Sequence, residues 1–234
     1  AKVVPGARCV QGDLCDPNGA WKCALANADA LIHFSAVNPY PNANWAESAG
    51  SMSHSFNVFV AAAACGVRRV ILASSNHVMG GYKDAPELGA VTPLSPPRCG
   101  TLLRDPTDRA KSGDAVAYAA AKLASEQLMR TLAATTGSRT TFLALRIGWC
   151  QPGENLPSTL NPSGSPPQFQ NRLDGAGADK GAPAADQDVD AEWFKNMWLS
   201  NGDFLRYFIA GLDTAVPAGE LLVLNAMSNN RGMR

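Results

Sequence analysis

The order of apolar and helical segments constrains the fold of this chain more than any single motif does. Four short apolar runs read as buried strands, at 30–34, 67–75, 140–147 and 221–225. Three segments of helical composition lie between them, at 45–65, 118–134 and 200–212. A regular alternation of strands and helices is typical of a parallel sheet with crossover helices. The sequence therefore predicts an α/β fold whose functional side chains lie at the carboxyl ends of the strands, a rim expected to hold Asp13, Ser35 and Ser75.

The remaining segments complete the expected layout. A short strand is predicted at Ala7–Gln11, then a turn at Gly12–Pro17 and a helix over Asn18–Ala28 with Trp21 and Leu25 on one face. Residues 80–114 read as a long loop, and such loops in compact domains are often functional. We expect three regions: a core at 1–150, a flexible excursion at 151–190, and a small substrate-side helix and strand at 191–234.

Composition narrows the class of function. The chain has 234 residues, 46% of them hydrophobic, and 20 basic residues balance 20 acidic ones. This balance gives no reason to expect nucleic acid or a membrane surface as a partner. No apolar run approaches the roughly 20 residues that span a bilayer. The six cysteines show no Cys-x-x-Cys pair and no zinc-like spacing, so we expect no metal, a reducing compartment and a cytoplasmic location.

Two polar features of this sequence together suggest a reaction site. Tyr118 and Lys122 are four residues apart in a segment rich in Ala, Leu, Lys and Glu, so they share one face of the expected helix. Ser75 ends the apolar run that begins near Val70. A tyrosine, a lysine one turn away and a serine at a strand end can transfer a proton beside a hydride-transfer cofactor. Either feature alone arises often by chance.

At this point the chain resembles the extended short-chain dehydrogenases, also called the nucleotide-sugar epimerase and dehydratase family. Ala73–Val78 and Arg146–Gly148 are most similar to the uronate dehydrogenase branch, as are Trp198–Ser200 with Asp203 and the Ser228-x-Asn230-Arg231 tail. The resemblance implies a Rossmann-like doubly wound parallel sheet that binds NAD or NADP. It also implies oxidation, reduction or epimerisation at a hydroxyl or carbonyl of a sugar or sugar-acid-like compound.

The resemblance implies a role for individual positions. Tyr118 would exchange a proton with the substrate hydroxyl, Lys122 would hold the nicotinamide ribose, and Ser75 would hydrogen-bond the reacting oxygen. Asp13 and Leu14 would flank the adenine of the cofactor, Tyr118, Lys122 and Ile147 would contact its nicotinamide end, and Phe34, Ser35 and Ala36 would line the cofactor. The substrate contacts would come from Asn38, Ser75, Asn76, His77 and Trp149.

The tyrosine needs help to act as a base. A free phenol has a pKa of about 10. Lowering this pKa to near 7, a change of roughly 3 pKa units, requires that the phenolate be stabilised over the phenol by about 4 kcal/mol. We expect the ammonium of Lys122, aided by the positive ring of an oxidised nicotinamide, to lower the pKa of Tyr118.

The chain departs from the family pattern in several places. No Gly-x-x-Gly-x-x-Gly turn is present, and Ala1 falls where the family's third strand would begin, which favours a fragment over the loss of a phosphate cradle. Ser51 replaces a helix asparagine that supports the lysine. Trp149 and Trp193 replace a serine and an arginine that clamp the substrate carboxylate, so a plain hexuronate is not the favoured substrate.

Other interpretations stay open from the sequence. Asp13 could equally be a simple turn residue, and His77 a loop histidine with no role in the reaction. The tryptophans Trp149, Trp193 and Trp198 could be packing residues that do not contact a substrate. We expect Arg146 to be an internal ion-pair partner and His33 a core histidine. The alternative function is a non-catalytic structural or regulatory subunit of the same fold. As in the family, a homodimer is expected through two long helices, Trp45–Cys65 and Tyr118–Ala134.

Overall fold

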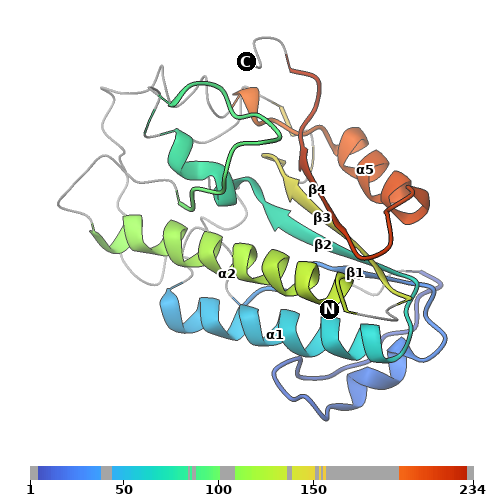
Figure 1. The fold of residues 1–234 in the computed structure, drawn as a ribbon. Coiled ribbons are helices and arrows are strands. Elements are labelled where there is room, and N and C mark those ends of the chain that lie inside the picture. Colours follow the sequence, from blue (N-terminus) through green and yellow to red (C-terminus); the bar gives the residue numbers. More distant parts are fainter. Residues whose placement is uncertain are drawn as a thin grey trace.

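A parallel four-stranded sheet forms the centre of the fold (Figure 1). The computed structural model describes residues 5–37, 44–83, 85, 88–100, 109–135, 139–150, 153, 155–156 and 195–230, with 109–115 described by their backbone alone. The strands lie in chain order and all neighbours are parallel: β1 (Ala30–His33), β2 (Arg69–Ser75), β3 (Thr141–Ile147) and β4 (Leu221–Ala226). The four strands predicted from the apolar runs are confirmed, and their carboxyl ends meet at one edge of the sheet.

Helices cover both faces of this sheet. Helices α1 (Trp45–Ala64) and α2 (Arg109–Ala133) lie side by side on one face, and α5 (Asn201–Asp213) lies on the other (Figure 1). Two short 3-10 helices complete the described structure, η1 (Ala20–Leu25) and η2 (Asn76–Tyr82). The doubly wound α/β arrangement expected from the sequence is therefore confirmed.

The helix ends follow the local sequence. Asn44 caps α1 by accepting a hydrogen bond from the backbone N–H of Glu47 at 2.9 Å, and the Glu47 carboxylate accepts one from the Asn44 N–H at 3.1 Å. Gly66 follows α1 with a φ of +72°, the left-handed conformation that glycine adopts without strain. Ser200 caps α5 as predicted, accepting from the Asp203 N–H at 3.0 Å.

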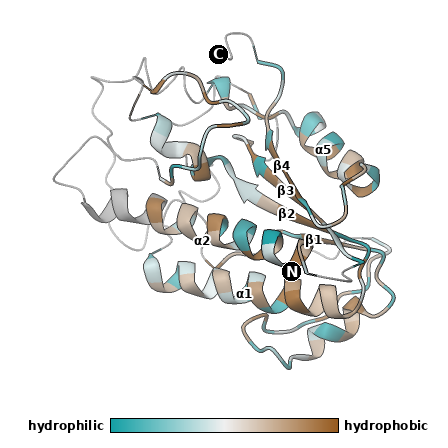
Figure 2. Cartoon of the chain, viewed as in Figure 1, coloured by the Kyte–Doolittle hydropathy of each residue, from teal (hydrophilic) through white to brown (hydrophobic). Residues whose placement is uncertain are grey.

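Alternate residues of the strands supply two separate hydrophobic cores. On the side of α1 and α2, Leu72 and Phe142 pack with Phe59 and Met129. On the side of α5, Ile71 and Leu143 pack with Phe208. The sheet between the helices is accordingly largely hydrophobic in Figure 2. Full burial of such a side chain contributes about 1.5–3 kcal/mol, so these two cores hold the strand ends in place.

Three local predictions were wrong. Ala7–Gln11 forms no strand, because this mostly exposed stretch pairs with none of the described strands. The helix expected over Asn18–Ala28 is the six-residue 3-10 helix η1, although Trp21 and Leu25 are buried as expected. The expected 80–114 loop is shorter at both ends, because η2 reaches Tyr82 and α2 begins at Arg109.

Candidate active site

One face of α2 carries three polar residues toward the sheet. Tyr118, Lys122 and Glu126 are spaced four residues apart, so they stack along this face, and Lys122 and Glu126 are buried. The Lys122 ammonium donates a hydrogen bond to the backbone oxygen of Ala73 in β2 at 2.9 Å, and it lies 5.8 Å from the centre of the Tyr118 ring. The helix thus presents the predicted tyrosine and lysine to the end of β2.

Glu126 fixes this helix against two strands. Its carboxylate accepts hydrogen bonds from the Ser74 hydroxyl at 2.5 Å and from two nitrogens of the Arg146 guanidinium at 2.7 and 3.0 Å. Arg146 therefore is the internal ion-pair partner that the sequence indicated. Glu126 and Ser74 were not predicted as site residues, although Glu126 continues the four-residue spacing of Tyr118 and Lys122.

Ser75 ends β2 directly opposite the tyrosine. Its hydroxyl forms a side-chain hydrogen bond with Tyr118 and also accepts one from the His77 N–H at 3.2 Å, which caps η2. The His77 ring lies edge-on to the Tyr118 ring at 6.1 Å. Among the described residues, the side-chain oxygen of Asn76 is buried without a hydrogen-bond partner. The predicted Ser75, Asn76, His77, Tyr118 and Lys122 therefore do come together.

The surrounding protein shifts the pKa values of Tyr118 and Lys122 in ways that were not predicted from the sequence. Burial raises the pKa of Tyr118 to about 12, although the hydrogen bond from Ser75 opposes this rise. Burial lowers the pKa of Lys122 to about 8, with the Glu126 carboxylate opposing the fall. The expected lowering of the pKa of Tyr118 was for Lys122 together with an oxidised nicotinamide; in the protein alone, the cost of burying a phenolate outweighs the Ser75 hydrogen bond.

Two buried histidines near this site stay neutral at pH 7. His33, as expected, is a core histidine: Nε2 lies 3.3 Å from the Ser55 hydroxyl and the ring packs edge-on against Phe59. Burial, with Lys122 nearby, lowers the pKa of His33 to about 3. Burial also lowers the pKa of His77 to about 4, with Lys83 adding to the effect. Neither histidine therefore carries charge into the site.

A second group of predicted residues lies around the end of β1. Asp13 is exposed in a turn, where its carboxylate accepts from the Cys15 N–H at 2.8 Å, so it does not end a strand as expected. The Ser35 hydroxyl lies 2.9 Å from Nδ1 of His54, a residue of α1 that was not predicted. Asp13 and His54 belong to one cluster of potential metal ligands, so Asp13 and Ser35 both lie beside the same histidine.

The other predicted positions have mixed surroundings. Leu14 packs against the hydrophobic core on the side of α1 and α2. Ile147, at the end of β3, packs against the core on the side of α5, and Ala36 is half-buried. Phe34 is 54% exposed, and its ring stacks on that of Phe204 at 6.1 Å and lies tilted against that of Phe208 at 4.9 Å, so it packs on α5.

Trp149 is buried, and its backbone forms two hydrogen bonds with the segment that precedes α5. Its N–H donates to the oxygen of Met197 at 2.6 Å and its oxygen accepts from the Leu199 N–H at 2.7 Å. This bridge favours the packing interpretation of the tryptophan. Asn38, Trp193, Arg231 and nearly all of the 151–190 excursion lie outside the described residues.

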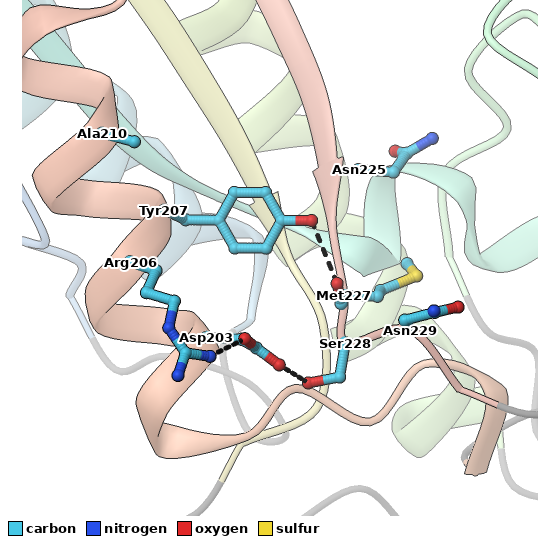
Figure 3. Close-up of a pocket in the computed structure, with 8 residues that line it drawn as sticks. All are labelled: Asp203, Arg206, Tyr207, Ala210, Asn225, Met227, Ser228 and Asn229. Carbon is cyan, nitrogen blue, oxygen red and sulfur yellow. Dashed lines mark hydrogen bonds and ion pairs between the residues drawn. The ribbon is translucent and has the colours of Figure 1, made fainter.

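A cavity of about 550 Å³ lies elsewhere, between α5 and the segment that follows β4 (Figure 3). Asp203 lines it and bonds to both Arg206 and Ser228, and the Tyr207 hydroxyl donates to the oxygen of Met227 at 3.0 Å (Figure 3). None of the predicted site residues lines this cavity, and its one carboxylate, that of Asp203, is already bonded to Arg206 and Ser228. The cavity is therefore separate from the site predicted from the sequence.

With this fold and site established, the chain belongs to the NAD dependent epimerase/dehydratase family, whose model matches residues 1–146. No described helix is both long and apolar enough to cross a bilayer. The extended short-chain dehydrogenase resemblance drawn from the sequence is thereby confirmed.

The chain is similar to two curated uronate dehydrogenases. It is 29% identical over 150 residues to one from Agrobacterium fabrum, covering 63% of this chain and 47% of that one. It is 36% identical over 87 residues to one from Pseudomonas syringae pv. tomato, covering 36% of this chain and 30% of that one. The chain matches less than half the length of either relative.

Solved structures show the same fold. One similar structure is MoeE5 in complex with UDP-glucuronic acid and NAD, with a TM-score of 0.63 and 20% identity, covering 94% of this chain and 63% of that one. At this identity the likeness concerns the fold, which is the Rossmann-like arrangement expected from the sequence.

Proposed function

We propose that this protein is an NAD-dependent oxidoreductase or epimerase that acts on a hydroxyl or carbonyl of a sugar or sugar acid. The convergence of Ser75, Tyr118 and Lys122 at the end of β2 is the observation that carries the proposal. The family name supports NAD as the cofactor, and the named relatives support a uronate or a UDP-sugar as substrate.

The residues present fit the nicotinamide end of this cofactor. The carboxyl ends of parallel strands are where ligands bind in such sheets, and Ser75 and Ile147 end two adjacent strands there. Lys122 would hold the nicotinamide ribose, and Ile147 would lie beside the ring. Asp13 and Ser35 would contact the adenine half from the end of β1. When bound, the cofactor supplies the hydride acceptor or donor.

Ser75 and Tyr118 would orient the reacting hydroxyl and move its proton. Because they already share a hydrogen bond, a substrate oxygen placed between them can contact both hydroxyls. Tyr118 would take the proton in the oxidation direction and return it in reduction. Since the protein's own groups raise the pKa of Tyr118 to about 12, the phenolate needs a further positive charge close by, such as an oxidised nicotinamide.

Lys122 contributes a fixed positive charge to the same site. Its pKa of about 8 lies above neutral pH, so the ammonium is the main form at pH 7. The hydrogen bond to Ala73 holds this charge below the Tyr118 ring. The buried Asn76 oxygen offers an acceptor for a second hydroxyl of a sugar. Because the Trp149 indole is buried and cannot clamp a carboxylate, we favour a modified sugar or sugar nucleotide over a plain hexuronate.

The surface of α1 supports a homodimer. Trp45, Met52, Phe56 and Val60 are 38–61% exposed, and their spacing places them on one stripe of the helix. Large apolar side chains gathered on one exposed face favour a protein partner. A second copy meeting this stripe across α1 and α2 would cover it. The six free thiols fit the proposed reducing, cytoplasmic location.

Cofactor binding tests the proposal most simply. NAD and NADP are titrated separately into the protein, and the thermal midpoint is followed. Binding at 100 times the dissociation constant adds about 2.7 kcal/mol of stability, which shifts the midpoint measurably. We expect a shift with NAD, followed by NADH formation with one member of a panel of uronates and UDP-sugars. No shift with either cofactor would favour the non-catalytic subunit.

A further inference from the structure

Three side chains with metal-binding atoms meet near Ser35, two residues after the end of β1. Asp13 and Cys15 come from the turn that precedes η1, and His54 comes from the middle of α1. A carboxylate oxygen, the Cys15 sulfur and a ring nitrogen of His54 all lie within 4.8 Å of one another. Carboxylate, thiolate and imidazole are the three ligand types that Zn²⁺ takes in proteins.

We propose that Asp13, Cys15 and His54 form a binding site for Zn²⁺ or a similar thiophilic divalent ion. Tetrahedral zinc with bonds of about 2.0–2.3 Å separates its ligand atoms by roughly 3.3–3.7 Å. Because the three atoms lie within 4.8 Å of one another, each pair needs to close by at most about 1.1–1.5 Å, which side-chain rotation can supply. Three protein ligands leave a fourth position for water or another molecule.

Hydrogen bonds from neighbouring residues fix the three ligand side chains relative to one another. The Asn57 amide donates to the backbone oxygens of Leu14 and Cys15 at 2.8 and 3.1 Å, which ties the Asp13–Cys15 turn to α1 three residues beyond His54. The Ser35 hydroxyl lies 2.9 Å from Nδ1 of His54. Such outer contacts on one ring nitrogen orient a histidine so that Nε2 faces a metal.

The charge and exposure of the cluster also suit a divalent ion. An ionised Asp13 and a Cys15 thiolate together carry two negative charges, which balance those of Zn²⁺. Both residues are exposed, so an ion reaches them from solvent without opening the fold. This site was not predicted from the sequence, because its ligands come from two separate segments and only one of them is a cysteine.

Metal at this site would affect the dinucleotide. Asp13 is the residue expected to contact adenine, so an ion that engages its carboxylate competes with that contact. This consequence, unlike the metal site, depends on the proposed function. It makes Zn²⁺ an inhibitor that acts on cofactor affinity and leaves the Tyr118 phenol untouched.

Cobalt titration of the metal-free protein tests the site itself. Co²⁺ bound by a thiolate gives a near-ultraviolet charge-transfer band, and we expect this band to saturate at one equivalent. Cys15→Ser should abolish the band, and His54→Gln should weaken Co²⁺ binding at least tenfold. Cys15→His should keep Zn²⁺ binding by calorimetry while losing the band. Cys23→Ser and Cys65→Ser, which remove other exposed thiols, should behave like the unchanged protein.

The possible results test the metal site and its proposed competition with NAD separately. A band that survives in Cys15→Ser, or that disappears in Cys23→Ser, overturns the site. If the site binds Co²⁺ and saturating NAD leaves the Co²⁺ affinity unchanged although NAD binds, the competition is wrong and the site stands. If NAD does not bind at all, the proposed function fails and the metal titration is unaffected.

Discussion

The carboxylate of Glu126 accepts two hydrogen bonds from the guanidinium of Arg146, at 2.7 and 3.0 Å, in the interior between α2 and β3. Glu126 also accepts from the Ser74 hydroxyl, one residue before Ser75. Because Glu126 lies one turn beyond Lys122 on the same helix, this pair sets how α2 lies on the sheet. The positions of Tyr118 and Lys122 over the end of β2 follow from it.

Removing one partner of this buried pair should be costly. Glu126→Ala leaves the buried Arg146 charge without its carboxylate, and we expect a loss of about 3–5 kcal/mol in the free energy of unfolding. Urea unfolding measures this loss. The matched control is Asp29→Ala, which breaks the exposed Arg68–Asp29 pair and should barely move the midpoint. Equal effects of the two substitutions would contradict a structural role for the buried pair.

Stability should fall as the pH drops below about 6.5. The pKa values of His33 and His77 in the folded protein, about 3 and about 4, lie below the value of about 6.5 expected in the unfolded chain. Between these values the unfolded chain binds more protons, so acid favours unfolding, by up to about 1.4 kcal/mol per pH unit for each histidine.

Urea unfolding at pH 7, 6 and 5 measures this slope. The double variant His33→Gln, His77→Gln removes both groups, so its stability should depend less steeply on pH than that of the unchanged protein. If the two proteins show the same slope, these histidines are not the acid-sensitive groups.

Two glycines of α5 should respond in opposite ways to alanine. A Cβ at Gly211 would lie 2.7 Å from Cδ2 of Leu143, so Gly211→Ala should force α5 off the sheet and cost about 1–3 kcal/mol. A Cβ at Gly202 meets nothing closer than 3.9 Å, so Gly202→Ala should be neutral or stabilise by up to about 1 kcal/mol. Thermal midpoints of the two variants decide whether close packing on Leu143 positions this helix.

The proposed dimer should depend on the exposed stripe of α1. Phe56, which is 56% exposed, lies in the middle of the stripe, so Phe56→Glu should convert a dimer into a monomer in light scattering. Leu94→Glu changes a residue that is 94% exposed and lies in a loop outside α1, so it should leave the dimer intact. A monomeric unchanged protein, or dissociation by both substitutions, would contradict this interface.

The sequence predicted the sheet well because its signals are local. The apolar runs ending at Ser75 and Ile147 and the cap at Ser200 are each visible within a few residues, and each is confirmed. The Ala7–Gln11 strand failed because its formation depends on a neighbouring strand, which a single segment does not reveal. The predicted roles of Tyr118, Lys122 and Ser75 remain proposals, although the three residues do converge.

Long-range contacts account for what the sequence did not show. Glu126 and Ser74 meet across an interval of 52 residues, and Ser35 and His54 join a strand end to a helix. Burial raises the pKa of Tyr118, and this was not predicted from the sequence, because burial is a property of the whole fold. Spacing along a helix indicates which residues share a face, and it does not give the degree of burial.

The central claim is that Tyr118 is the proton-transferring group of an NAD-dependent site, and its substitution by phenylalanine tests this most directly. Tyr118→Phe removes one hydroxyl and keeps the ring that packs against His77. NADH formation is measured for both proteins with the substrate found in the panel, with NAD affinity and thermal midpoint as controls. We predict a turnover reduced about 10²–10⁴-fold with NAD binding and folding retained. Unreduced turnover in Tyr118→Phe would contradict the account.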